Sequence, residues 1–160
     1  MYRATGEKAL RCVGETEFVN GVAAVAASGV YGETQACAGI VGHADLRGGE
    51  SVADVLQAHI QAGGGRFRGI RQSAAHDGDP SVLGPLSTRG AAKELLSDPD
   101  FRRGFAALAP LGLSFDAWLL EPQLPELLDL ARAFPDTTIV LDHVGGPVGI
   151  GAYAGQRDAR

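Results

Sequence analysis

Side chains that can do chemistry recur in this sequence where apolar runs end. The run ACAGIVG at 36–42 is followed by His43, and TTIVLD at 137–142 is followed by His143. The ordinary pKa of imidazole lies near neutrality, so a histidine in such a place can be a general acid, a general base or a metal ligand. We therefore expect His143 to be catalytic; the alternative is a histidine that only hydrogen-bonds the following turn. For His43 we expect a place in the substrate site.

Two arginines and an aspartate accompany these histidines. Arg68 and Arg71 belong to the run FRGIR at 67–71, and Asp116 lies within LGLSFDAWLL. A guanidinium holds a carboxylate or phosphate through two parallel hydrogen bonds. Both arginines are candidates for substrate binding, and Arg71, last in its run, is the better one because residues three apart in a strand face opposite sides. Asp116 could be a general base, a metal ligand or the ion-pair partner of an arginine.

The other two histidines are expected to have ordinary structural places. His59 falls within the apolar spacing of the segment 51–62 and should pack in the core. His76 lies in SAAHDGDP, a polar stretch typical of a loop, where an exposed turn histidine is the simple interpretation.

Apolar patterning predicts alternating strands and helices. We expect a loop at 1–17, a helix at 18–28 and strands at 36–42, 67–71, 111–120 and 137–143. Further helices are expected at 51–62, from Asp98 onward and at 122–134, with a long connection from 72 to about 97. Asp98 and Pro99 are a typical helix cap and first residue. Alternation at this spacing predicts a parallel sheet with right-handed helical crossovers.

The number of units suggests an incomplete barrel. Four strand-helix units are half of an eightfold barrel, which needs roughly 250 residues. We expect one domain over residues 1–160, an α/β partial barrel of about four parallel strands that lacks the first and last barrel strands. A complete open sheet of the flavodoxin kind is the alternative. In both architectures the carboxyl ends of the strands carry the active site, which selects the residues named above.

Composition excludes several classes of protein. With 14 Lys and Arg against 19 Asp and Glu, the formal charge is -5, and no basic stripe suggests nucleic acid. No apolar run approaches the roughly 20 residues of a membrane span, and no leader segment is visible. Cys12 and Cys37 lack metal-site spacing, so reduced thiols in a cytoplasmic protein are expected. The sequence also lacks the nucleotide-binding glycine motifs and the GxSxG nucleophile motif.

Several separated strings resemble one known family. VGHADL, GGGRFRGIR, PQLPELLDLARAFPDTTIVLDHVGGP and YAGQRD together resemble the amidohydrolase-related branch of the amidohydrolase superfamily, over essentially the whole chain. These are TIM-barrel hydrolases that include lactonases acting on 2-pyrone-4,6-dicarboxylate and on sugar lactones. The resemblance implies hydrolysis of a small carboxylated lactone or an amide-like bond, with water activated at the barrel mouth by an acid and sometimes by zinc or manganese.

The resemblance also assigns barrel positions. His43 would lie on the third strand, Arg71 on the fourth, Asp116 on the fifth and His143 on the sixth, where His143 would be the metal ligand if there is one. The His-x-His of the first strand and the Asp of the eighth have no counterpart, so the chain is expected to be an internal fragment. Asp116 stands where metal-binding members carry a histidine, which favours a metal-independent reaction.

Two functional hypotheses follow. The first is a hydrolase of this family, inactive or weakly active as this chain, with a small molecule as its substrate. The second is a non-catalytic fragment or an α/β module that binds a small anion. Because four parallel strands leave two sheet edges open, self-association through those edges is expected in either case.

Overall fold

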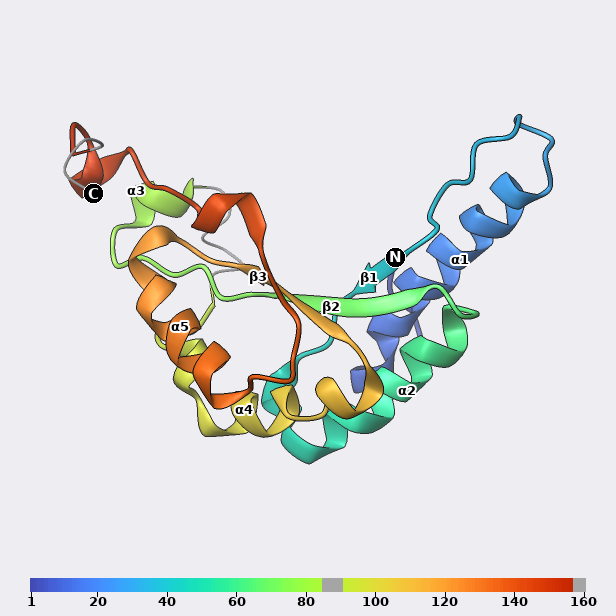
Figure 1. Cartoon of the computed structure of the whole chain (residues 1–160), viewed down its shortest axis with the longest axis horizontal. Helices are drawn as coiled ribbons and strands as arrows, with labels where there is room; N and C mark the ends of the chain where they lie inside the picture. Colours follow the sequence, from blue (N-terminus) through green and yellow to red (C-terminus); the bar gives the residue numbers. More distant parts are fainter. Residues whose placement is uncertain (85–90, 157–160) are drawn as a thin grey trace.

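A four-stranded parallel sheet organises the molecule. The computed structural model describes residues 1–84 and 91–156. The strands lie side by side in chain order, each parallel to the next (Figure 1): β1 (Ile40–Gly42), β2 (Phe67–Ser73), β3 (Ser114–Trp118) and β4 (Ile139–Leu141). The carboxyl ends of all four strands therefore meet at one edge of the sheet.

Helices cover one face of this sheet and leave the other open. Four of them form an arc below the strands (Figure 1), with α1 at one end of the arc and α5 at the other. Their bounds are Val13–Ala27 for α1, Val52–Ala62 for α2, Pro99–Phe105 for α4 and Leu124–Ala133 for α5; the short α3 is Pro80–Leu83. The sheet does not close, so the predicted partial barrel with four parallel strands is confirmed. In the described residues no helix has the length and apolar character needed to cross a membrane.

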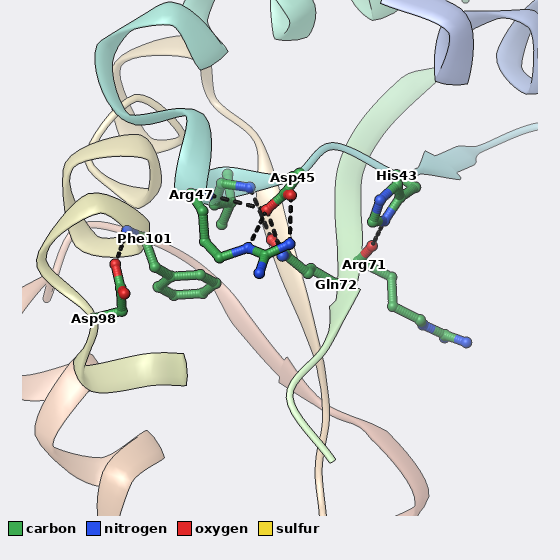
Figure 2. Close-up of polar contacts among 8 residues, drawn as sticks. His43, Asp45, Arg47, Arg71, Gln72, Asp98 and Phe101 are labelled. Atoms are coloured by element: carbon green, nitrogen blue, oxygen red, sulfur yellow. Dashed lines mark hydrogen bonds and ion pairs between the residues drawn. The ribbon is translucent and has the colours of Figure 1, made fainter. Parts of the chain in front are cut away.

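The core lies between the sheet and the helices. Phe115 of β3 contacts Phe101 and Phe105 of α4 edge to face, with ring centroids 6.0 and 5.2 Å apart. All three rings are fully buried. The predicted cap of α4 is confirmed, because the Asp98 carboxylate accepts hydrogen bonds from the backbone N–H groups of residues 100 and 101 and Pro99 follows it (Figure 2).

Close packing of α4 requires a glycine. A Cβ atom on Gly104 would lie 2.2 Å from the backbone oxygen of Leu46. We expect Gly104→Ala to lower the free energy of unfolding by about 1–3 kcal/mol, since α4 must move off the loop beneath it. Gly21 in α1 is the matched control, because a Cβ there meets no atom within 4 Å. Gly21→Ala should leave stability unchanged or raise it by about 0.5–1 kcal/mol in urea unfolding; equal effects of the two variants would contradict this packing.

The amino-terminal third differs from the sequence prediction. The predicted loop at 1–17 contains a 3₁₀ helix at Lys8–Cys12, and α1 begins at Val13 rather than near residue 18. Val13 and Thr16 are fully buried, so tertiary packing stabilises a turn whose polar sequence gave no helical signal. The strand predicted at 36–42 is only Ile40–Gly42, because Cys37 has a left-handed backbone with φ 55°.

The later elements also differ in length. The strand predicted at 111–120 is Ser114–Trp118, and the connection from 72 to 97 contains the end of β2, α3 and a 3₁₀ turn at Leu95–Ser97. The strand predicted at 137–143 ends at Leu141, since His143 and Val144 are left-handed, with φ 50° and 56°. A left-handed valine is unusual because its branched Cβ crowds the backbone. His143 is thus carried on a tight turn after the strand.

Candidate functional site at the carboxyl ends of the strands

A β-bulge sets the direction of the arginines in β2. Ile40 pairs with Phe67 but Val41 pairs with Gly69, so Arg68 is an extra residue in β2. An extra residue shifts the alternation of a strand. Phe67 and Ile70 are consequently both buried and the two arginines are both exposed. The prediction that Arg68 and Arg71 face opposite sides is therefore wrong.

Arg71 binds two buried carboxylates. Asp116 is its direct neighbour across the β2–β3 pairing, and the Asp116 carboxylate lies 3.3 Å from an Arg71 terminal nitrogen. The Asp142 Oδ2 lies 2.9 Å from Arg71 Nε, without hydrogen-bond geometry, and this oxygen is a buried atom with no hydrogen bond. The aspartate side chains are 12% and 10% exposed, whereas Arg71 is 49% exposed. One guanidinium thus joins three strand ends and still faces solvent.

His43 lies beside this arginine. Its Nδ1 is 3.0 Å from the backbone oxygen of Arg71, which can only accept, so Nδ1 donates and Nε2 is left for another partner (Figure 2). The backbone oxygen of His43 in turn accepts a hydrogen bond of 3.0 Å from Nε2 of the buried His59. His43 is therefore held from two directions, by β2 and by α2.

A second polar network adjoins His43. The Gln72 side chain accepts a hydrogen bond from Leu46 N and donates one of 2.9 Å to Asp45, which also pairs with Arg47 (Figure 2). Hydrogen bonds from Arg47, together with those from its backbone and from Gln72, lower the pKa of Asp45 to about 2 against the opposing effect of burial. Asp45 is consequently ionised at neutral pH, and the network fixes the loop that follows β1.

These groups open into one cavity. A space of about 1020 Å³ is lined by His43, Asp45, Arg71, Gln72 and Ser73, together with residues from the amino-terminal segment and from 91–95. Figure 2 shows the Arg71 guanidinium extending away from Asp45 and Gln72. The Ser73 hydroxyl is buried without a hydrogen-bond partner among the described residues. The arrangement presents the Arg71 guanidinium and the His43 imidazole to a small polar molecule.

The sequence-predicted residues are only partly brought together. Arg71, Asp116 and His43 form one connected group, as described. Arg68 does not join them, because its guanidinium bonds the backbone oxygens of Gly65 and Phe67 at the beginning of β2. His143 lies on the turn after β4, and its imidazole is exposed with no side-chain partner among the described residues. The catalytic roles predicted for His143 and Asp116 stay predictions.

Two residues of the group have no role that the sequence predicts. Asp142 directly follows an apolar run and is expected at a strand end, but only its neighbour His143 is a predicted site residue, and the ion pair with Arg71 is a finding of the structure. No sequence pattern predicts a role for Gln72, because an amide side chain at the end of a strand has no charge and its hydrogen-bond partners are known only from the structure. His59 is buried and stacked on Phe67, with centroids 4.9 Å apart, so its predicted core position is confirmed.

The described residues offer no site for a metal ion. The parts of the chain that the structure describes contain no group of three or more His, Cys, Asp or Glu side chains that could hold one. Asp116 and Asp142 both face Arg71, whose charge opposes a cation there. The residues present therefore do not fit a metal centre, and we derive no reaction step through a metal.

Comparison with known proteins identifies the family. The amidohydrolase family model matches residues 12–160. The chain is 42% identical over 124 residues to the uncharacterized protein y4mH of Sinorhizobium fredii, covering 76% of this chain and 38% of that protein. It is 30% identical over 118 residues to an L-fucono-1,5-lactonase of Burkholderia ambifaria, covering 74% and 35%.

A solved structure agrees with these matches. The fold is similar to that of an amidohydrolase from Burkholderia multivorans crystallised with bound HEPES, with a TM-score of 0.56 and 25% identity over 82% of this chain and 38% of that one. This chain thus spans little more than a third of the length of its relatives. Since the family match covers nearly all of its residues, the chain belongs to the amidohydrolase family.

Proposed function

We propose that this chain supplies the substrate-binding half of a hydrolase that opens a small carboxylated lactone or cleaves a related amide-like bond. The observation that carries the proposal is the Arg71 guanidinium, oriented by two buried carboxylates and exposed at a cavity beside His43. A guanidinium already fixed by ion pairs binds a substrate carboxylate with little further loss of side-chain entropy. The lactonase relative from Burkholderia ambifaria supports the choice of a lactone.

Each residue then has a stated role. Arg71 binds the carboxylate of the substrate, and His43 accepts a hydrogen bond from a substrate hydroxyl at its Nε2. His143 moves a proton during ring opening, in which water adds to the carbonyl carbon and the ring C–O bond breaks to give a hydroxy acid. Asp116 acts through Arg71, whose position it sets. We propose further that this chain is inactive or weakly active alone, because it covers a little over a third of its relatives.

Turnover tests the proposal. Carboxylated lactones and L-fucono-1,5-lactone would be assayed with the 160-residue chain and with a chimera in which this chain replaces the matching segment of the Burkholderia multivorans amidohydrolase, with and without zinc or manganese. We expect turnover in the chimera, and a loss of about 10²-fold or more in His143→Gln. His43→Phe should chiefly raise KM. Arg132→Ala, an exposed arginine on α5, is the control.

A binding measurement covers the second hypothesis. Calorimetric titration of the 160-residue chain with a dicarboxylate should show binding that Arg71→Lys weakens about tenfold. Binding without turnover in a folded chimera would favour the small-anion module. If substitution of Arg71 changes neither the affinity for the dicarboxylate nor the turnover rate, both hypotheses are excluded.

A further inference from the structure

Both edge strands of the sheet are apolar where edge strands are normally protected. β4 reads Ile-Val-Leu, the pattern of a strand buried on both faces, yet Val140 and Leu141 are 45% and 44% exposed. In β1, Val41 is 44% exposed. Neither strand carries the charge or proline that usually prevents an edge from pairing with another strand. These edges have the composition of interior barrel strands.

Helix α1 also exposes an apolar surface. Its second half, from Phe18 to Ala27, contains no charged residue. Phe18, Val22 and Val25 are 49%, 38% and 51% exposed, and their spacing of four and three places them on one stripe. An exposed apolar stripe on a helix normally packs against another element. The stripe lies on the helix at the β1 end of the arc (Figure 1).

The opposite end of the arc carries a matching groove. Between α5 and β4 lies an apolar depression of about 510 Å³, lined by Leu124, Pro125, Leu127, Leu128, Ala131 and Ile139. Leu128 is 51% exposed there. In a closed barrel each helix packs on the next one around the ring. The groove is thus where the helix after β4 would lie, and the stripe on α1 is a helix surface with no earlier neighbour among the described residues.

We infer that two copies of this chain associate head to tail into a closed eight-stranded barrel. At each of two equivalent junctions, β4 of one copy pairs with β1 of the other, and α1 of the second copy fills the α5 groove of the first. Among the described residues of each copy, four strands and the four helices of the arc (α1, α2, α4 and α5) give the eight strands and eight helices that such a barrel requires. A head-to-tail contact forms a ring when its rotation closes, and half a barrel closes with two copies.

The surface available is sufficient for a dimer. Seven large apolar residues at the junctions are between 38% and 51% exposed: Phe18, Val22, Val25, Val41, Leu128, Val140 and Leu141. If such a residue has a full accessible surface of roughly 150–200 Å², covering them buries on the order of 1,000 Å² in the dimer. Backbone and other side chains add to this, which brings the total into the range of about 1,200–2,000 Å² for stable interfaces. Closure also faces the two Arg71 sites toward each other across one barrel.

Sedimentation of the full 160-residue chain tests the assembly. We expect a species of about 33 kDa, twice the 16.5 kDa of one chain. Leu128→Glu and Val22→Glu should each raise the dimer dissociation constant by about tenfold or more, since each buries an unpaired charge. Ile150→Glu is the matched control, because Ile150 is 52% exposed and is not among the residues of the proposed junction. A wild-type monomer, or equal effects of the three variants, would overturn the inference.

Cross-linking distinguishes this dimer from other assemblies. Cysteines at positions 22 and 128, in a Cys37→Ser background, would be treated with a short bismaleimide. The double variant Val22→Cys/Leu128→Cys should form covalent dimers, whereas either single cysteine should not, because equivalent positions lie on opposite sides of the barrel. Cross-linking of a single variant indicates a face-to-face dimer, and a ladder of higher oligomers indicates edges that do not close into a ring. Either result contradicts the half-barrel dimer.

Discussion

Replacing Arg71 with alanine should lower the free energy of unfolding by about 2–3 kcal/mol. The change leaves the carboxylates of Asp116 and Asp142, 12% and 10% exposed, beside each other without a counter-charge. Removing one partner of a buried ion pair costs roughly 3–5 kcal/mol, and the half-exposed arginine reduces this because water screens its charge. Urea unfolding at neutral pH, followed by circular dichroism, measures the loss.

Two further variants separate charge from packing. In the triple variant Arg71→Met, Asp116→Asn and Asp142→Asn, most of the stability should return, because no carboxylate is then left unpaired. Arg71→Lys should lie between wild type and Arg71→Ala, since an ammonium cannot reach two carboxylates as a planar guanidinium does. If Arg71→Ala unfolds at the wild-type urea concentration, the two aspartates are not held by this arginine.

Replacing His59 with alanine should lower the free energy of unfolding by about 3 kcal/mol. The ring is fully buried and stacked on Phe67, and its two nitrogens contact the Thr16 hydroxyl at 2.8 Å and the His43 backbone oxygen at 3.0 Å. The substitution opens a cavity and leaves two buried polar groups without partners. His59→Ala should also loosen His43, which a weaker dicarboxylate titration would detect. A loss below about 1 kcal/mol would mean that neither contact matters.

We also expect His59 to make the free energy of unfolding depend on pH. Nε2 must donate to the His43 oxygen, and in the neutral ring Nδ1 then accepts a hydrogen bond from the Thr16 hydroxyl. Burial lowers the pKa of His59 in the folded protein, so the unfolded chain binds the proton more readily. Stability is therefore complete above a pH of about 6.5 and falls as the pH drops from there toward the lower folded-state pKa.

Two variants test whether His59 causes this dependence of stability on pH. His59→Gln should remove the loss of stability below pH 6.5, apart from the contribution of acids at lower pH. His143→Gln should leave it unchanged, because that imidazole is exposed. A slope that persists in His59→Gln would place the titrating group elsewhere.

The sequence by itself determined the class of fold and the edge of the sheet that carries the site. Apolar runs separated by amphipathic segments predict parallel strands with helical crossovers, because each element has to bury its apolar side. Polar residues after those runs, such as His43 and Asp142, must then gather where the carboxyl ends meet. The cap at Asp98 and the core position of His59 were also predicted, since both depend on residues close in the sequence.

The tertiary structure decided which of these residues act together. The bulge at Arg68 depends on the pairing of β1 with β2, and no local pattern reveals it. Arg71 meets Asp116 and Asp142 through the register of three strands, 45 and 71 residues apart along the chain. The beginning of α1 at Val13 and the turn that carries His143 likewise depend on packing between distant segments. Side-chain partners across a sheet are set by register, and register follows from the assembled core rather than from any one segment.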